Sequence, residues 1–463
     1  MSYVFYDLET SGLEKPFDQI FQFGAIYTDE NLNVIDSIDV RCNRLSEVVP
    51  SPKALIVTRV SPNDIISQSL SHYEMMCLVS SWITERSPAT FIGHNSIDFD
   101  EKFLRYALYK SLHGPYLTSS FGSMRSDTML MCHAAFHHDP ENLKLAYQNE
   151  KMTFRLGPIA RANGIEFPEE IAHDAMADIQ ATLNLAKHLR DNAPNVWRVM
   201  KSNSSAEGVM ALLAESDYCF LSAVYFGRPY SYVVCKASAS VENDKEIALF
   251  DLSNDPDKFL EMETYELVSA LSSKAKPFRI VKANNSPILF PKDLPSSYVK
   301  GGLLSAEVYE QRAKKVIENV EFHQRLAEAI PQRYSAGDPA EHVEDRLYEG
   351  FFQEDDYLKM EVFHSSLWED KAGVVESFLD PRLREIGNRI ICEEAPEHAN
   401  PKVLDNYRKW VEYRLTTTDS VSWTTIDKAM TDLADISSSE DPKDKALCDE
   451  IREFLIGLSV EAL

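Results

Sequence analysis

The sequence lacks the features of a secreted, disulfide-bonded or membrane-spanning protein. No uninterrupted apolar run approaches the ~20 residues needed to cross a bilayer, and the first residues show no basic-then-apolar leader. The seven cysteines are odd in number and form no CxxC pair, which indicates reduced, buried, structural thiols. We therefore expect a cytoplasmic protein with no membrane association. The cysteines are Cys42, Cys77, Cys132, Cys219, Cys235, Cys392 and Cys448.

Basic residues are scarce relative to acidic ones. The 463 residues include 47 Lys and Arg against 73 Asp and Glu, so the formal net charge is −26. This balance argues against a polyanionic substrate. It does not decide the matter, because the local field of a groove and bound metal ions govern such binding, and formal net charge ignores both. The length indicates two or three domains.

The first part of the chain alternates strands with helices. Three successive strands in an antiparallel meander are expected at 4–9, 20–29 and 34–42. A buried strand at 89–96 and helices at 100–112 and from 175 to about 190 follow. The pattern predicts a mixed α/β domain that ends near Pro194.

The character of the sequence changes after this point. Short strand-like runs such as "YCFLSAVYFG" and "EIALFDL" predominate, interrupted by one helical candidate at about 257–272. From Ser305 onward, patterns such as "AEVYEQRAKKVIENVEFHQRLAEAI" and "KDKALCDEIREFLIGL" predict helices. We expect an α/β domain, a β-rich domain and a helical domain. Their expected bounds are 1–193, 194–339 and 340–463.

Two carboxylates interrupt the first predicted strand, "YVFYDLETSG". Asp7 and Glu9 are two residues apart, so in a strand they point to the same face. In one interpretation the strand has ended and both acids are solvated loop residues, since Thr10, Ser11 and Gly12 read as a turn. In the other, a cation lies between them, because paired carboxylates at the end of a core strand suit Mg²⁺ or Mn²⁺.

Further acids occur at two places in the same domain. Asp98 and Asp100 lie where a helix begins, so either helix capping or metal binding explains them. Asp178 shares a helix face with apolar side chains, so it should be partly buried, which is costly without a partner. His173 belongs to the loop before that helix, for which Asp174 is a plausible cap. A lone histidine there fits a structural or a catalytic role.

The ordered motifs "DLET", "GHNSIDFD" and "HDAMAD" resemble the three motifs of the DEDDh exonucleases, which have a ribonuclease H-like fold. The resemblance implies that Asp7, Glu9, Asp100 and Asp178 bind two Mg²⁺ ions ~4 Å apart, for which Mn²⁺ substitutes. It also implies that His173 is the general base. The family pattern makes Asp98 a neighbour of the site and not a ligand.

The resemblance extends along the chain and narrows to the bacterial exonuclease I family. It is carried by "RLGPIARANGIEFPEEIAHDAMADIQATLNLAK", "FRIVKANNSPILF", "EDRLYEGFF" and "RKWVEYRL". It implies a nuclease domain, an SH3-like β domain and a helical C-terminal domain. The implied activity is processive 3′-to-5′ exodeoxyribonuclease hydrolysis of single-stranded DNA to 5′-mononucleotides, in DNA repair and recombination. The sequence departs from the family at Asp98, where relatives carry a basic residue.

The family pattern also implies substrate contacts. Glu9 and Thr10 would meet the terminal nucleotide, and Arg155 resembles an arginine that contacts substrate. Arg105 and Tyr116 would contact the strand, through charge for phosphate and an aromatic face for a base. The alternatives are that Arg105 lies on a solvated helix face and that Tyr116 is an ordinary aromatic residue of a turn. A strand-tracking surface is a further hypothesis for the densest basic run, Lys274, Lys276, Arg279 and Lys282.

The implied partners are single-stranded DNA and the C-terminal tail of single-stranded DNA-binding protein, and we expect a monomer. Two alternatives come from other classes. One is a DEDDh exonuclease that acts on RNA 3′ ends, because the same metal chemistry cleaves both polymers. The other is a catalytically inactive nucleic-acid-binding protein, which the five filled motif positions disfavour.

Overall fold

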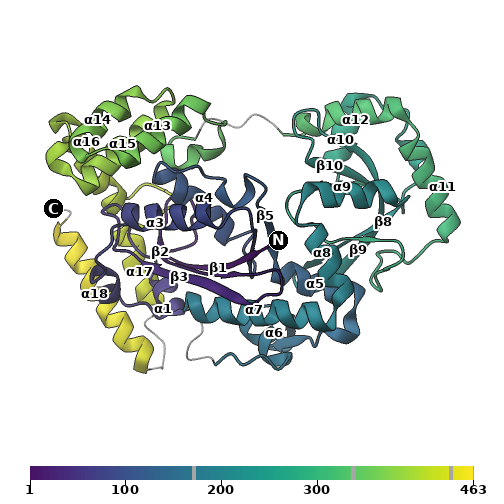
Figure 1. The fold of residues 1–463 in the computed structure, drawn as a ribbon, viewed down its shortest axis with the longest axis horizontal. Coiled ribbons are helices and arrows are strands. Elements are labelled where there is room, and N and C mark those ends of the chain that lie inside the picture. The colour runs from purple at the N-terminus through teal and green to yellow at the C-terminus, as the bar shows by residue number, and fades with distance from the viewer. Residues whose placement is uncertain (169–173, 335–339, 437–441, 462–463) are drawn as a thin grey trace.

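The computed structural model describes residues 1–168, 174–334, 340–436 and 442–461. Two five-stranded sheets and a group of helices lie in a row, with the N-terminal sheet in the middle (Figure 1). Within the described ranges, no helix is long and apolar enough to cross a membrane.

The first sheet has the strand order β3-β2-β1-β4-β5. Its strands are β1 (Tyr3–Thr10), β2 (Ile20–Thr28), β3 (Val34–Arg41), β4 (Thr90–Gly93) and β5 (Met124–Asp127). β1, β2 and β3 pair antiparallel, which confirms the predicted meander, whereas β4 is parallel to both β1 and β5. The mixed sheet agrees with the predicted α/β fold.

Helices cover both faces of this sheet. Alternate residues of β1 enter different cores. Phe5 packs on the side of α5 (Thr128–His138) and α7 (Ala175–Asn192), and Tyr6 packs on the side of α3 (His72–Glu85) and α4 (Asp100–Lys110). Asp7 and Glu9 share the face of Phe5, and their carboxylates therefore point toward α7. The first-domain helices are α1 (Pro52–Thr58), α2 (Pro62–Ile66), α3 (His72–Glu85), α4 (Asp100–Lys110), α5 (Thr128–His138), α6 (Leu156–Ala162) and α7 (Ala175–Asn192). A small hairpin, β6 (Ala146–Gln148) and β7 (Lys151–Thr153), precedes α6.

A glycine sets how closely α7 approaches the sheet. Gly24 on β2 pairs with Asp7 on β1. A Cβ at this glycine would lie 2.7 Å from Ile179 Cδ1, closer than packed atoms allow, and 3.1 Å from Ala175 Cβ, which is tighter than most packed contacts. Asp174 caps the helix by accepting hydrogen bonds from two backbone N–H groups of its first turn, which confirms the predicted cap. The start of α7 is thus held beside the end of β1.

The second sheet is antiparallel, with the order β11-β10-β9-β8-β12. Its strands are β8 (Cys219–Tyr225), β9 (Arg228–Ala239), β10 (Glu246–Asp251), β11 (Phe278–Lys282) and β12 (Leu289–Pro291). The helices of this region are α8 (Pro194–Ser202), α9 (Ala206–Glu215), α10 (Thr264–Ser272), α11 (Ala306–Ile317) and α12 (Val320–Gln332). The predicted β-rich region is present, and α10 lies within the helix expected at about 257–272. An SH3-like topology stays a prediction.

One apolar core joins the two sheets. It contains Phe5 of β1 and Trp197 of α8, and it continues into Phe220 of β8 and Phe322 of α12. Figure 1 shows α5 and α8 between the sheets, where they bridge the two halves of this core. The boundary predicted at residue 194 falls between α7 and α8, inside this continuous packing.

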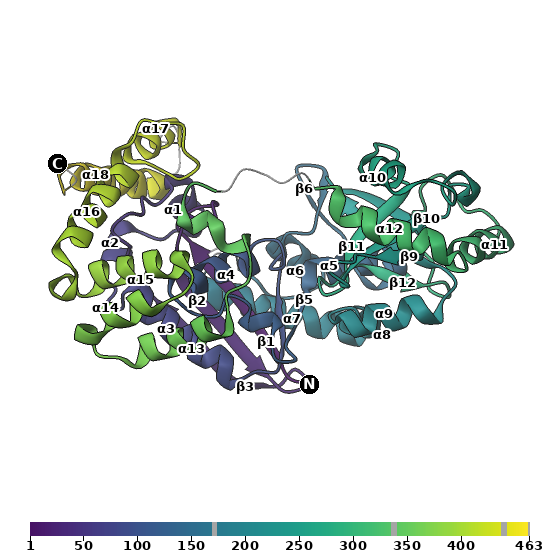
Figure 2. The ribbon, with the colours of Figure 1, turned by 90° about the horizontal axis from the view of Figure 1, so that it is seen from above.

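The chain beyond residue 340 is helical, as predicted. The described residues there form α13 (Glu354–Ser365), α14 (Trp368–Ser377), α15 (Pro381–Glu394), α16 (Pro401–Thr416), α17 (Ile426–Ile436) and α18 (Pro442–Glu461), with 3₁₀ turns at Val343–Tyr348 and Pro396–His398. These helices pack on the first domain at two places, around Tyr109 of α4 and around Leu55 of α1. Figure 2 shows them on the side of the first sheet opposite the second sheet.

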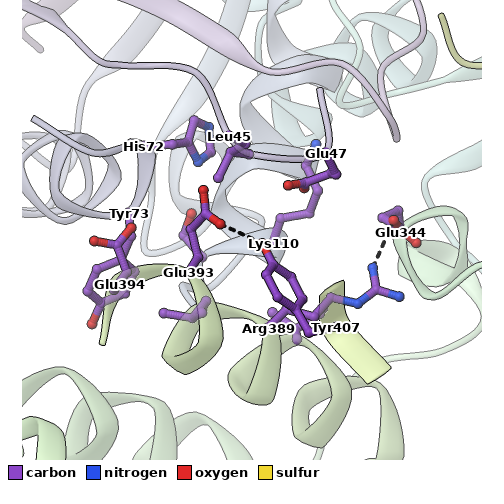
Figure 3. A pocket seen from close by; sticks show the side chains of 13 residues that line it. Leu45, Glu47, His72, Tyr73, Lys110, Glu344, Arg389, Glu393, Glu394 and Tyr407 are labelled. Atoms are coloured by element: carbon purple, nitrogen blue, oxygen red, sulfur yellow. Dashed lines mark hydrogen bonds and ion pairs between the residues drawn. The ribbon is translucent and has the colours of Figure 1, made fainter. Parts of the chain in front are cut away.

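A charged cavity lies at this junction (Figure 3). Its lining from the first domain includes Glu47, Tyr73 and Lys110, and its lining from the helical region includes Arg389 and Glu394. Burial lowers the pKa of Lys110 to about 8 and raises the pKa of Glu394 to about 7. The two regions therefore meet through charged groups as well as through apolar contacts.

Candidate active site

The first strand does not end before its acids. β1 continues through Thr10, and only 7% of Glu9 is exposed. The Thr10 hydroxyl donates a hydrogen bond of 2.8 Å to the carbonyl of Gly12, so the turn follows the strand. The interpretation of Asp7 and Glu9 as solvated loop residues is therefore wrong.

Asp100 and Asp98 have different environments although they lie two residues apart. Asp100 is the first residue of α4 and is 4% exposed, and a hydrogen bond from the backbone of Leu8 stabilises its charged form. The Asp98 side chain is 77% exposed and forms an ion pair of 3.0 Å with Lys102. Neither acid caps α4, whose N-cap is Phe99, so the capping alternative is wrong. Only Asp100 faces the end of β1.

Asp178 completes a group of four acids. It lies in the first turn of α7 and is half-buried, as predicted. Burial raises the pKa of Asp7 well above its usual range, and the charges of Asp100, Glu9 and Asp178 raise it further. Burial, followed by the charges of Asp178 and Asp100, raises the pKa of Glu9 to about 9. Asp7, Glu9 and Asp100 thus share one electrostatic environment that disfavours their ionisation, and the charge of Asp178 contributes to it.

Such an environment fits divalent cations. Carboxylate oxygens are the preferred ligands of Mg²⁺ and Mn²⁺, and a cation removes the repulsion that raises these pKa values. Among the described residues, no three of the four acids bring oxygen atoms within 4.8 Å of one another, so they line a shared space and do not enclose one point.

His173, the expected base, lies outside the described residues. The residue after it, Asp174, is placed: its carboxylate lies 2.8 Å from Arg41 and its charge contributes to the raised pKa of Glu9. The helix α7 begins at Ala175, after Asp174. The role of His173 stays a prediction.

Asp127 is a supporting residue that sequence reasoning missed. Its buried carboxylate accepts hydrogen bonds from the backbone N–H groups of Asn95, at 2.9 Å, and Ile97, at 3.2 Å. It also caps α5 through Met129. Burial raises its pKa to about 6, and its charge helps to raise the pKa of Asp100. Asp127 therefore fixes the loop that delivers Asp100. An aspartate before an apolar helical run predicts the helix cap, but it does not predict that the same carboxylate also holds the loop of Asn95 and Ile97.

Arg105 and Tyr116, the two residues expected to contact the strand, lie together. The Arg105 guanidinium lies 5.0 Å from the centre of the Tyr116 ring, and it forms an ion pair of 2.8 Å with the buried Glu101. The alternative of a solvated helix face for Arg105 is therefore wrong. Tyr116 also lies 5.8 Å from the ring of Phe351, which is 84% exposed. Together they form an aromatic and cationic surface that suits a nucleotide, while both substrate contacts stay predictions.

The other predicted contacts are dispersed. Arg155 is exposed at the start of α6. In the basic run, Arg279 stacks 3.6 Å above the ring of Tyr232 and lies 3.4 Å from Asp251. Arg279 and Lys276 line a cavity of about 340 Å³ on the second sheet. Arg279 is thus already engaged within the protein, which leaves the lysines as the more available cations of this run.

Comparison with known proteins agrees with this geometry. Residues 4–186 match the family model described as Exonuclease, and residues 341–458 match that of the Exonuclease I C-terminal domain. The exodeoxyribonuclease I of Haemophilus influenzae is 26% identical over 434 residues, which are 89% of this chain and 90% of that protein. The Escherichia coli protein of the same name is also 26% identical, over 89% of each chain.

Solved structures agree with the fold as a whole. Exonuclease I from Methylocaldum szegediense superposes with a TM-score of 0.83 at 22% identity over 99% of both chains. Escherichia coli exonuclease I in complex with a dA16 oligonucleotide gives the same TM-score at 21% identity, also over 99% of both chains. The two family models together match more than half of the sequence, and the likeness spans the whole fold. The chain therefore belongs to the bacterial exonuclease I family.

Proposed function

We propose that this protein is a 3′-to-5′ exodeoxyribonuclease that hydrolyses single-stranded DNA to 5′-mononucleotides. The observation that carries the proposal is the mutual electrostatic coupling of Asp7, Glu9, Asp100 and Asp178 at the end of β1. The names of the relatives, exodeoxyribonuclease I, and a structural neighbour that binds a dA16 oligonucleotide support the choice of DNA as substrate.

The four acids would hold two divalent cations, Mg²⁺ by preference, with Mn²⁺ able to substitute. A related Escherichia coli structure contains a zinc ion, which supports a divalent metal requirement. Two bound cations would supply positive charge that makes a water easier to deprotonate and that stabilises the leaving oxygen. The acids contribute by placing this charge at the end of the sheet, where the terminal nucleotide would lie.

The remaining chemistry falls to side chains of this chain. His173 would accept the proton of the attacking water, since histidine titrates near neutrality. The water oxygen bonds to the terminal phosphorus, and the bond from phosphorus to the 3′ oxygen breaks, which releases a 5′-mononucleotide. Glu9 and Thr10 would contact the terminal nucleotide. Arg105, Tyr116 and Arg155 would contact the strand.

We further propose that the strand stays bound between cleavages. A strand held at several nucleotides through phosphate contacts and stacking dissociates slowly, because weak interactions combine. The surface of Tyr116 and Phe351 spans the first domain and the helical region, which makes it suited to hold a base. One structural neighbour, exonuclease I, has a structure that suggests how processivity is achieved. Residues 1–193 would then serve catalysis. Residues 194–339 and 340–463 would serve strand retention.

The cellular setting is part of the same proposal. A structural neighbour was solved as an SSB/Exonuclease I complex, and we propose that this chain also binds the C-terminal tail of single-stranded DNA-binding protein. With a net charge of −26, the chain would hold an acidic tail only in a local basic pocket, so binding should weaken with salt. We place the protein in the cytoplasm as a monomer, with a role in DNA repair and recombination.

The deciding experiment compares degradation of 3′-ended single-stranded DNA, duplex DNA and RNA, each with Mg²⁺ and with EDTA. We expect Mg²⁺-dependent release of mononucleotides from single-stranded DNA. Faster release from RNA would favour the RNA exonuclease alternative, and binding without hydrolysis would favour the inactive one. Asp178→Asn and Asp98→Asn form a matched pair, because only the first removes an acid from the coupled group. A trap of excess unlabelled strand then measures the nucleotides removed per binding event.

A further inference from the structure

Three potential metal ligands gather away from the four acids. Cys77 lies on α3, His113 follows α4, and His364 lies on α13. One donor atom from each lies within 4.8 Å of the other two. Figures 1 and 2 both place α13 beside α3, so residues nearly 300 positions apart in sequence meet here. The proposed nuclease activity does not use this cluster.

His364 is already oriented as a ligand. Its Nε2 lies 3.0 Å from the carbonyl oxygen of Leu112, which can only accept, so Nε2 carries the proton. The lone pair therefore resides on Nδ1, which lies 2.9 Å from the Tyr73 hydroxyl and 3.8 Å from Cys77 Sγ. A carbonyl that fixes the far nitrogen is the usual support of a metal-bound histidine. Tetrahedral zinc holds nitrogen and sulfur donors ~3.6 Å apart, close to the observed distance.

One ring nitrogen of His113 has no hydrogen-bond partner. Its ring stacks on His364 with centroids 3.9 Å apart and planes at 6°. Its Nε2 is buried and has no hydrogen-bond partner, which is costly for a polar atom. A metal ion lies in the plane of each imidazole that binds it, so coordination requires that one ring turn out of the stack. His113 can turn without breaking a hydrogen bond at Nε2.

We propose that Cys77, His113 and His364 bind one Zn²⁺ ion, a site separate from the nuclease centre. Imidazole and thiolate ligands suit zinc, whereas the four carboxylates suit harder cations. Binding expels the thiol proton of Cys77 to solvent, and a water or the Tyr73 oxygen fills the fourth position. The ion would connect α3 and the end of α4 to α13, and so join the first domain to the helical region.

One neighbouring charge limits the affinity. The Lys371 ammonium, also buried, lies 3.5 Å from the Tyr73 hydroxyl and 4.8 Å from the centre of the Trp368 ring. Its positive charge opposes a cation, and the Cys77 thiolate offsets part of this repulsion. The site should therefore bind zinc more weakly than a site without such a neighbour. Tyr73 also lines the charged cavity of Figure 3, so the cluster borders that cavity.

Titration of the full-length protein with Co²⁺ in excess Mg²⁺ tests the proposal. Mg²⁺ occupies the carboxylates, and a thiolate-to-cobalt charge-transfer band reports sulfur ligation, which the four acids cannot produce. We expect one equivalent of Co²⁺ to give the band and one equivalent of Zn²⁺ to abolish it. Zn²⁺ should also raise the melting temperature, because a ligand that binds only the folded state stabilises it.

Variants distinguish the cluster from other thiols. Cys77→Ser should abolish the band. His113→Gln should weaken Zn²⁺ binding by ~100-fold or more, because loss of a residue that only hydrogen-bonds to a metal ligand already lowers metal affinity by up to ~100-fold. Cys448→Ser, which changes a buried cysteine outside the cluster, should leave the titration unchanged. Should Cys77→Ser fail to fold, His113→Gln still tests the site. No band in the wild type, or unchanged affinity in His113→Gln, would overturn the proposal.

Discussion

Confining Glu9 among three other carboxylates should cost measurable stability in metal-free protein. Burial, followed by the charges of Asp178 and Asp100, raises its pKa from 4.5 to about 9. A carboxyl whose pKa is higher in the folded than in the unfolded protein favours folding below its unfolded pKa. That contribution is lost as the pH rises through the folded value. Stability should therefore fall between about pH 4.5 and 9.

The size of the effect follows from the shift. One pKa unit corresponds to about 1.4 kcal/mol, so a Glu9 that titrates alone would lose ~5 kcal/mol of stability between pH 4.5 and 8. Asp7 and Asp100 share protons with it, which reduces the part that Glu9 carries. We expect Glu9→Gln to raise the free energy of unfolding by about 2–4 kcal/mol at pH 8 in EDTA, and by less than about 1 kcal/mol at pH 5.

Urea denaturation followed by tryptophan fluorescence, in EDTA at both pH values, measures this difference. With added Mg²⁺ the wild type should become more stable than Glu9→Gln. The wild type keeps all four ligands, so metal binding raises its free energy of unfolding by more. The control is Asp98→Asn, an exposed acid next to the site, whose effect should stay within about 0.5 kcal/mol. If Glu9→Gln is no more stable than the wild type at pH 8 in EDTA, the coupled-carboxylate reasoning is wrong.

Four further substitutions test other parts of the site. Asp178→Ala should lower nuclease activity by several orders of magnitude without lowering the melting temperature in EDTA; full activity would contradict its assignment as a ligand. His173→Ala should lower turnover by ~10²- to 10⁴-fold at neutral pH and change the shape of the pH-rate profile, whereas a structural histidine would change only the melting temperature. Gly24→Leu should displace α7 and destabilise the fold by about 1–3 kcal/mol with a larger loss of activity, while Gly373→Ala, which meets nothing within 4 Å, should do neither. Tyr116→Ala should weaken binding of single-stranded DNA by about 1–3 kcal/mol in a filter assay, and unchanged affinity would remove it from the strand path.

The parts of the site that sequence predicts are those encoded within a few residues. Asp7 and Glu9 are recognisable because strand periodicity places them on one face, and the start of α7 because Asp174 is a good cap. Their meeting with Asp100 and Asp178 required the family motifs, since periodicity does not say which helix covers which strand. The antiparallel meander and the helical C-terminal region were predicted for the same local reasons.

Contacts between distant residues were beyond such reasoning. The second role of Asp127 depends on a loop that folds back to it, and the ion pair between Arg105 and Glu101 depends on a burial that helix periodicity does not report. His364 meets Cys77 only because α13 packs on the first domain. Each of these pairings is determined by tertiary packing, and no spacing within one segment predicts it.

The core shared by the two sheets has a mechanical consequence. A hinge between them would have to open the packing around α8, whose Trp197 ring lies 5.9 Å from the Tyr3 ring, and expose apolar surface on both sides. The sheets should therefore move as one rigid body, and an advancing strand would slide over a fixed surface instead of being gripped by a closing one. A deletion after residue 193 would strip one side from this core, so strand retention is better tested by surface substitutions such as Lys276→Ala than by truncation.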